Sequence, residues 1–188
     1  MDTREVEQYI QEGLEARRLI DVEQVVRIGK VISEAYRKGR KTMFFGNGGS
    51  AADSQHIAAE FVGRFEKERK PLPSLALSVN SSSVTAISND YSYNNVFERQ
   101  VRAFSVEGDV AVGLSTSGNS TNVVNALRAA RTIGCYCVAM TGSKGGKVEE
   151  YAHEVIRVGS SRTSIIQEVH IAVGHILSKI VEEDIFGQ

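Results

Sequence analysis

The sequence predicts an α/β protein: a three-layer, doubly wound sheet of about five parallel strands, with a helical arm at residues 1–40. Two observations lead to this prediction. From residue 42 onward, short apolar runs alternate with helix-like stretches, as in repeated strand–helix–strand units. The runs themselves, such as residues 110–114, lack the polar alternation of a half-exposed strand. Such strands are expected to be covered by helices on both faces.

The first two elements are expected to be helices at residues 2–18 and 21–38, the second with Asp21 as its N-cap, folded into an antiparallel arm. A long helix from about Thr163 to Glu183 is expected to end the chain, with an apolar stripe wide enough to contact another subunit as well as the sheet. The apolar runs between them predict strands at residues 42–45, 75–79, 110–114, 135–140 and 154–158.

Composition narrows the class of protein. A chain of 188 residues with 41% hydrophobic residues suits one domain, residues 1–188. Twenty-two Lys and Arg against 23 Asp and Glu leave no basic footprint for nucleic acid. No apolar run approaches the ~20 residues that span a bilayer, so we expect a cytoplasmic protein without a membrane partner. Cys135 and Cys137 point to the same strand face and are expected to be buried thiols.

The first candidate site follows the strand expected at 42–45. The turn Gly46-Asn47-Gly48-Gly49-Ser50 opens a helix, and its glycines allow backbone N–H groups to face a ligand at the helix N-terminus. His56 and Glu60 lie four residues apart on that helix and therefore share one face. A binding loop and an ionisable pair are thus adjacent, although a histidine on a helix can also be a polar group without a role in chemistry.

The second candidate site follows the strand expected at 110–114. Within the turn from Ser115 to Ser120, four side-chain hydroxyls and a helix N-terminus suit the terminal oxygens of a phosphate monoester. The alternative is a tight turn with Ser120 as a helix cap. Neither a Gly-Lys-Ser/Thr ending nor a G-x-G-x-x-G run occurs, so no nucleotide or redox cofactor is expected. The four hydroxyls belong to Ser115, Thr116, Ser117 and Ser120.

With these loops in view, the chain resembles the SIS (sugar isomerase) family over nearly its whole length. Any one of the matching motifs alone is weak, but together they are specific. They are Gly46-Asn47-Gly48-Gly49-Ser50, His56 to Glu60 with Gly63-Arg64, Asn89-Asp90, Gly108-Asp109, Ser115 to Ser120, Thr141-Gly142, and Ile166-Gln167-Glu168-Val169-His170 with His175. His170 lies outside the positions that the match selects, and is expected at a subunit contact or behind the site residues.

The resemblance implies an aldose–ketose isomerase. Within the family it is nearest to enzymes that convert sedoheptulose 7-phosphate to D-glycero-D-manno-heptose 7-phosphate through an enediol, for ADP- or GDP-heptose precursors. By the same match, Glu60 and His175 would be the acid/base pair, with Gln167 beside them. The substrate would be held by Asn47, Gly48 and Gly49 along the sugar, Asn89 and Asp90 at its hydroxyls, and Ser115, Thr116, Ser117 and Ser120 at the phosphate. Ser164 stands where many members carry aspartate, which leaves one hydroxyl contact open.

Some members of the family hold a zinc ion, and the matching ligands here would be His56, Glu60, Gln167 and His175. Gln167 and His175 are eight residues apart, about 12 Å along a helix. Both can reach one ion only if it sits between them or if they come from different subunits. Glu60 cannot serve fully as ligand and as base at one moment. The acid/base assignment is therefore preferred over the zinc assignment.

The resemblance also implies a homotetramer with active sites between subunits. An alternative function remains: some SIS proteins are non-catalytic sugar-phosphate-binding regulators or partners in replication initiation. Glu60 and His175 argue for the enzyme, because a sensor needs the phosphate loop but neither proton carrier.

Overall fold

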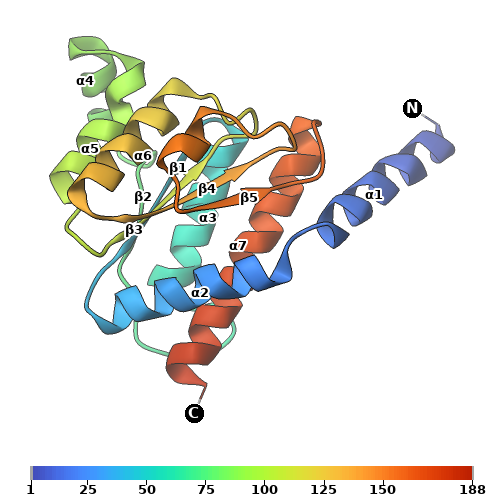
Figure 1. Cartoon of the computed structure of the whole chain (residues 1–188), viewed down its shortest axis with the longest axis horizontal. Helices are drawn as coiled ribbons and strands as arrows, with labels where there is room; N and C mark the ends of the chain where they lie inside the picture. Colours follow the sequence, from blue (N-terminus) through green and yellow to red (C-terminus); the bar gives the residue numbers. More distant parts are fainter. Residues whose placement is uncertain (1, 188) are drawn as a thin grey trace.

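The computed structural model describes residues 2–187, which form a five-stranded parallel sheet with helices on both faces (Figure 1). A strand occurs at each of the predicted apolar runs, but β2 (Ser74–Ala76) is shorter than the predicted run 75–79. In chain order the elements are α1 (Thr3–Arg18), α2 (Val22–Arg37), β1 (Thr42–Gly46), α3 (Gly49–Val62), β2 (Ser74–Ala76), α4 (Ser81–Asp90), the 3-10 turn η1 (Tyr93–Asn95), α5 (Val96–Phe104), β3 (Val110–Leu114), α6 (Thr121–Ile133), β4 (Tyr136–Thr141), the 3-10 turn η2 (Lys147–Tyr151), β5 (Glu154–Arg157) and α7 (Thr163–Phe186).

The strand order is β2-β1-β3-β4-β5, so β1 and β3 are hydrogen-bonded neighbours while β2 lies at the edge. The chain therefore reverses its direction of travel across the sheet between β1 and β3. At such a switch point the loops leaving the two strands diverge to opposite faces, and ligands bind in the crevice that this opens. The glycine-rich turn follows β1 and the hydroxyl-rich turn follows β3. The order of the strands thus brings the two predicted sites together.

Alternate residues of each strand fill two separate core layers. On β1, Phe44 packs into the layer that contains α2, α3 and α7, whereas Met43 and Phe45 pack into the layer that contains α5 and α6. All five residues of β1 and of β3 are buried. This two-sided burial explains why these strands lack polar alternation.

The predicted antiparallel arm is wrong in its packing, although both helices are present. The two helices follow each other around a bend instead of folding back on one another, and α1 projects from the body whereas α2 does not (Figure 1). Ile28 and Ile32 of α2 are fully buried in the core layer shared with α7. The only buried residues of α1 are Gly13 and Ala16. The reason is that the apolar stripe of α2 matches the sheet and α7, so α2 serves as a covering helix of the domain.

The two cysteines are buried and free, as predicted. Burial raises the pKa of the Cys137 thiol to about 12, which keeps it protonated and unreactive. Within residues 2–187, no helix combines the length and the apolar character needed to cross a bilayer.

Candidate active site

The turn after β1 presents the N-terminus of α3. Gly48 caps the helix with φ of 55° and ψ of −122°, a conformation that residues with a side chain rarely adopt. A Cβ atom on Gly49 would come within 2.6 Å of Oε1 of Gln167. Gly48 and Gly49 are both exposed. The two glycines therefore leave backbone N–H groups open to a ligand, with the Gln167 amide directly against the loop.

The side chain of Asn47 connects this turn to the neighbouring elements. Its amide exchanges two hydrogen bonds with the buried Asn122 amide of α6, at 2.9 and 2.8 Å. Its Oδ1 also accepts a hydrogen bond of 3.0 Å from the hydroxyl of Tyr93 in η1. Asn47 thus fixes the first loop against the start of α6, and its side chain already has protein partners.

The turn after β3 is tightly folded. Ser115 donates a hydrogen bond of 2.9 Å from Oγ to Oγ of Ser120. Gly118 has a positive φ of 67°, and a Cβ there would lie 2.0 Å from the carbonyl oxygen of Gly145. The predicted turn is therefore present, but two of its four hydroxyls are bonded to each other.

A polar pocket of about 330 Å³ adjoins this turn. Thr116 and Ser117 line it from the β3 loop, and Lys144 lines it from the loop after β4. The other lining residues are Asn119, Gly142, Ser143, Ser160, Ser161 and Thr163. Lys144 supplies a positive charge that the hydroxyl-rich turn lacks. Sequence reasoning missed it because the β4 loop is separated from the turn by a whole helix and strand.

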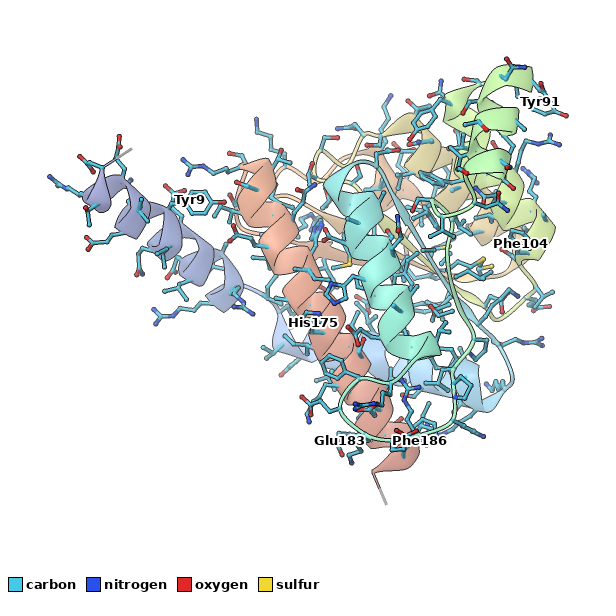
Figure 2. The ribbon with its side chains drawn as sticks, turned by 180° about the vertical axis from the view of Figure 1, so that it is seen from behind. Tyr9, Tyr91, Phe104, His175, Glu183 and Phe186 are labelled. Atoms are coloured by element: carbon cyan, nitrogen blue, oxygen red, sulfur yellow. The ribbon has the colours of Figure 1, made fainter. Side chains whose placement is uncertain are left out.

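The ionisable residues of α3 and α7 converge. Nε2 of His56 lies 3.0 Å from Oε1 of Glu60 and 3.3 Å from Nε2 of His175. The rings of His56 and His175 meet edge to face, with centroids 4.9 Å apart. His175 lies where α7 runs beside α3 (Figure 2). The structure therefore brings the predicted acid/base residues, Glu60 and His175, to within 4.8 Å of each other in one chain, and each of them contacts His56.

Close packing of α3 against α7 makes this contact possible. Gly174, next to His175, faces Ile57, next to His56, and a Cβ on Gly174 would lie 2.4 Å from Cγ1 of Ile57. Gln167 meets Gly49 two turns earlier on both helices. Since both contacts advance in the same direction, α3 and α7 run parallel and side by side. The absent side chain of Gly174 sets how closely they approach.

The chemistry of this donor set fits a zinc ion. Ligand atoms of His56, Glu60 and His175 all lie within 4.8 Å of one another. Tetrahedral zinc with ligands at ~2.0–2.2 Å needs donor atoms roughly 3.3–3.6 Å apart, which small movements would give, and His2Glu is a donor set of catalytic zinc sites. The Gln167 amide instead lies at the level of Gly49. Its assignment as fourth ligand stays a prediction.

Two predicted sugar-binding residues lie apart from this cluster. Asn89 and Asp90 end α4, a helix with no buried residue, which projects at the far side of the domain from α7 (Figure 1). Both are exposed, and Nδ2 of Asn89 donates to Oδ1 of Asp90 at 2.9 Å. Within residues 2–187, no hydrogen bond joins them to the other predicted site residues. Their proposed role needs a substrate that bridges the distance or a second subunit.

Asp53 is a further candidate beside this cluster that sequence reasoning missed. It lies one turn before His56, on the face of α3 that carries Gly49, His56 and Glu60 at spacings of four, three and four. Burial raises its pKa to about 6, an effect that the charge of His56 partly offsets. Its Oδ2 is buried and has no hydrogen-bond partner among residues 2–187. The helical spacing is the signal that could have identified it.

Comparison with known proteins decides the family. The SIS domain matches residues 7–142. The phosphoheptose isomerase of Aquifex aeolicus is 52% identical over 161 residues, covering 86% of this chain and 84% of the relative. The phosphoheptose isomerase of Clostridium acetobutylicum is 47% identical to this chain. The match covers 97% of this chain and 96% of the relative. The chain belongs to the phosphoheptose isomerase family of SIS-domain proteins.

A solved member of the phosphoheptose isomerase family has the same fold. The structure of the phosphoheptose isomerase from Neisseria gonorrhoeae matches with a TM-score of 0.89 at 37% identity, over 96% of this chain and 98% of that chain. The resemblance drawn from the sequence motifs is thereby confirmed. Of the two roles expected for His170, the subunit contact is wrong, because His170 is fully buried within its own chain, whereas a place behind the site residues stays a prediction.

Proposed function

We propose that this protein is an aldose–ketose isomerase that converts sedoheptulose 7-phosphate to D-glycero-D-manno-heptose 7-phosphate. The observation that carries the proposal is the cluster that His56 and Glu60 of α3 form with His175 of α7. Such a reaction needs a base for the carbon-bound proton, a group that transfers a proton between the two sugar oxygens, and a binding site for the phosphate. Relatives named phosphoheptose isomerase at about 50% identity point to the same activity.

The substrate would lie across the switch point. Its phosphate dianion would bind at the turn that contains Thr116 and Ser117, where Lys144 adds a positive charge. The sugar would extend along Gly48 and Gly49 toward α3. Ser115 and Ser120 would bind phosphate after their mutual hydrogen bond opens. Gln167 would contact the sugar from its place against Gly49.

Glu60 and His175 would carry the two kinds of proton transfer. The carboxylate of Glu60 would remove a proton from C1 of the ketose and return it to C2. The intermediate is the enediol, which keeps all its electrons and needs no redox cofactor. His175 would pass a proton between O1 and O2, because an imidazole gains and loses protons near neutral pH. His56 lies between the two groups and would hold them in register.

We also propose that His56, Glu60 and His175 can hold a zinc ion, in a state in which Glu60 is a ligand and does not act as the base. When bound, zinc would polarise the sugar carbonyl as a Lewis acid. The donor set and its spacing support this assignment. Inductively coupled plasma mass spectrometry of protein purified without chelator tests it directly, with a His56→Ala variant as the control expected to lose the metal.

We propose that the protein assembles as a homotetramer with active sites between subunits. We also propose that it is a single-domain cytoplasmic enzyme that supplies heptose precursors. Large apolar side chains of α1, α2 and α7 are exposed on a single chain and support the proposal. They are Ile10, Leu14, Val22, Val26 and Ile176, each 41–72% exposed. Asn89 and Asp90 would then reach the active site of a neighbouring subunit. Sedimentation velocity tests the assembly.

A product assay tests the function. Purified protein incubated with sedoheptulose 7-phosphate, without nucleotide, is expected to form the aldose heptose 7-phosphate. Fructose 6-phosphate serves as the six-carbon comparison. The alternative, a non-catalytic sugar-phosphate-binding regulator or a replication-initiation partner, is favoured if no aldose forms while a sugar phosphate binds tightly.

A further inference from the structure

Arg69 and Glu182 form a buried ion pair outside the site described above. The side chains are 2% and 3% exposed, and Nε of Arg69 lies 3.0 Å from Oε1 of Glu182. Arg69 belongs to the loop after α3, and Glu182 lies two turns after His175 on α7. Burying two charges is costly unless many hydrogen bonds compensate. The partners of each group show what the pair holds together.

Glu182 binds the loop backbone. Its Oε2 accepts hydrogen bonds from the backbone N–H of Glu66 at 2.7 Å and of Lys67 at 2.9 Å, and its Oε1 accepts one from Phe65 at 3.1 Å. Burial alone would raise the pKa of Glu182, but these three donors together with Arg69 hold it below its usual value. The carboxylate is therefore charged and fixes three successive residues of the loop against α7.

Arg69 binds the end of α3. Its Nη2 donates to the carbonyl oxygen of Glu60 at 2.6 Å, and its Nη1 donates to those of Phe61 at 2.9 Å and Gly63 at 3.1 Å. The last carbonyl groups of a helix have no partner within the helix. The guanidinium group supplies that partner for the helix that carries His56 and Glu60.

Phe65 connects the Arg69–Glu182 ion pair to His175. Its backbone N–H is bound by Glu182, and its ring is stacked on the imidazole of His175 with centroids 5.8 Å apart and an interplanar angle of 27°. One ion pair thus contacts the main chain of Glu60 directly and determines which ring lies against His175.

We propose that Arg69 and Glu182 are positioning residues for the isomerisation: they set the placement of α3 against α7 and so the distance between Glu60 and His175. This inference rests on the proposed function of that site. The substrate-holding loops lie at the opposite end of α3 from the pair. Loss of the pair is therefore expected to affect the chemical step more than substrate binding, since misplacement of reacting groups by about 1 Å can cost ~100-fold in rate.

The decisive variant is Glu182→Gln, which keeps the shape but removes the charge. Its control is Glu183→Gln, whose exposed side chain pairs with Lys67 at 2.6 Å and Lys179 at 3.6 Å and touches neither catalytic residue. Assays run well below the unfolding midpoint remove the contribution of lost stability. We expect kcat of Glu182→Gln to fall roughly 10- to 100-fold with KM within about twofold. Glu183→Gln is expected to keep both constants.

A second readout does not depend on turnover. The imidazole resonances of His56 and His175 should move in the NMR spectrum of Glu182→Gln, while those of His153, at the far edge of the sheet, should not. Phe65→Leu leaves the ion pair in place, and it should lower kcat and move the His175 signal even if Glu182→Gln fails to fold.

Two outcomes separate the claims. If wild-type protein does not isomerise the sugar phosphate, the proposed function fails, whereas the histidine resonances still test the positioning role. If Glu182→Gln and Phe65→Leu fold, turn over at the wild-type rate and leave both resonances unmoved, the positioning role is refuted.

Discussion

A methyl group added at Gly174 should separate the catalytic helices. A Cβ there would lie 2.4 Å from Cγ1 and 2.5 Å from Cδ1 of Ile57, more than about 1 Å inside an ordinary carbon–carbon contact. Ile57 is fully buried and β-branched, so it has little freedom to rotate away. The strain must move α3 relative to α7, and His56 and His175 move apart with them.

The magnitudes distinguish an effect on geometry from an effect on folding. Overpacking costs about 1–3 kcal/mol. Replacing glycine by alanine in a helix stabilises the fold by about 1 kcal/mol, because alanine has the higher helix propensity. The net loss of stability in Gly174→Ala is therefore small, about 0–2 kcal/mol. A displacement near 1 Å is nevertheless expected to lower kcat roughly 100-fold. Steady-state kinetics and urea unfolding on the same preparation measure the two effects.

Gly29→Ala is the matched control. A Cβ at Gly29 would lie 2.6 Å from Cγ2 of Ile180, so the overlap is similar, but it strains α2 against α7, where no site residue meets another. This variant should lose stability and keep its kcat. If Gly174→Ala folds and turns over like wild type, or if Gly29→Ala loses as much activity, the spacing of α3 and α7 does not set the rate.

Two further predictions concern pH. Burial lowers the pKa of His170 from 6.5 to about 4. As the pH falls, the unfolded chain therefore takes up a proton on His170 before the folded chain does. Stability should therefore fall by about 3 kcal/mol as pH drops from 6.5 to 4, and urea unfolding of His170→Gln should show a flatter dependence. Because burial raises the pKa of Asp53 to about 6, its carboxylate destabilises the fold once ionised. Asp53→Asn should be more stable than wild type at pH 8, by no more than about 1 kcal/mol given its partial exposure, and this gain should vanish below pH 4 by thermal unfolding.

The sequence was sufficient for the strands and the loops that follow them. Apolar runs such as residues 110–114 show two-sided burial directly, and helical spacing places His56 and Glu60 on one face. Strand order was not predicted, because an apolar run carries no information about its neighbour in the sheet. The contact of His56 with His175 depends on the packing of α3 against α7, which the family resemblance implied and the residue pattern alone could not.

The misses have physical reasons as well. The antiparallel arm was wrong because the pattern of α2 specifies an apolar stripe but not the surface that covers it. Lys144 reaches the pocket through tertiary folding of a loop from the next strand. Arg69 and Glu182 are separated by more than a hundred residues, so nothing local marks two surface-type side chains as a buried pair.

The proposed reaction depends on the carboxylate of Glu60, which would carry the proton between C1 and C2. Turnover of sedoheptulose 7-phosphate by Glu60→Gln tests it most directly, because glutamine keeps the shape and cannot take up a proton. We predict that kcat falls by roughly 10²- to 10⁴-fold while the unfolding midpoint stays near that of wild type. A folded Glu60→Gln enzyme with wild-type kcat would contradict the account.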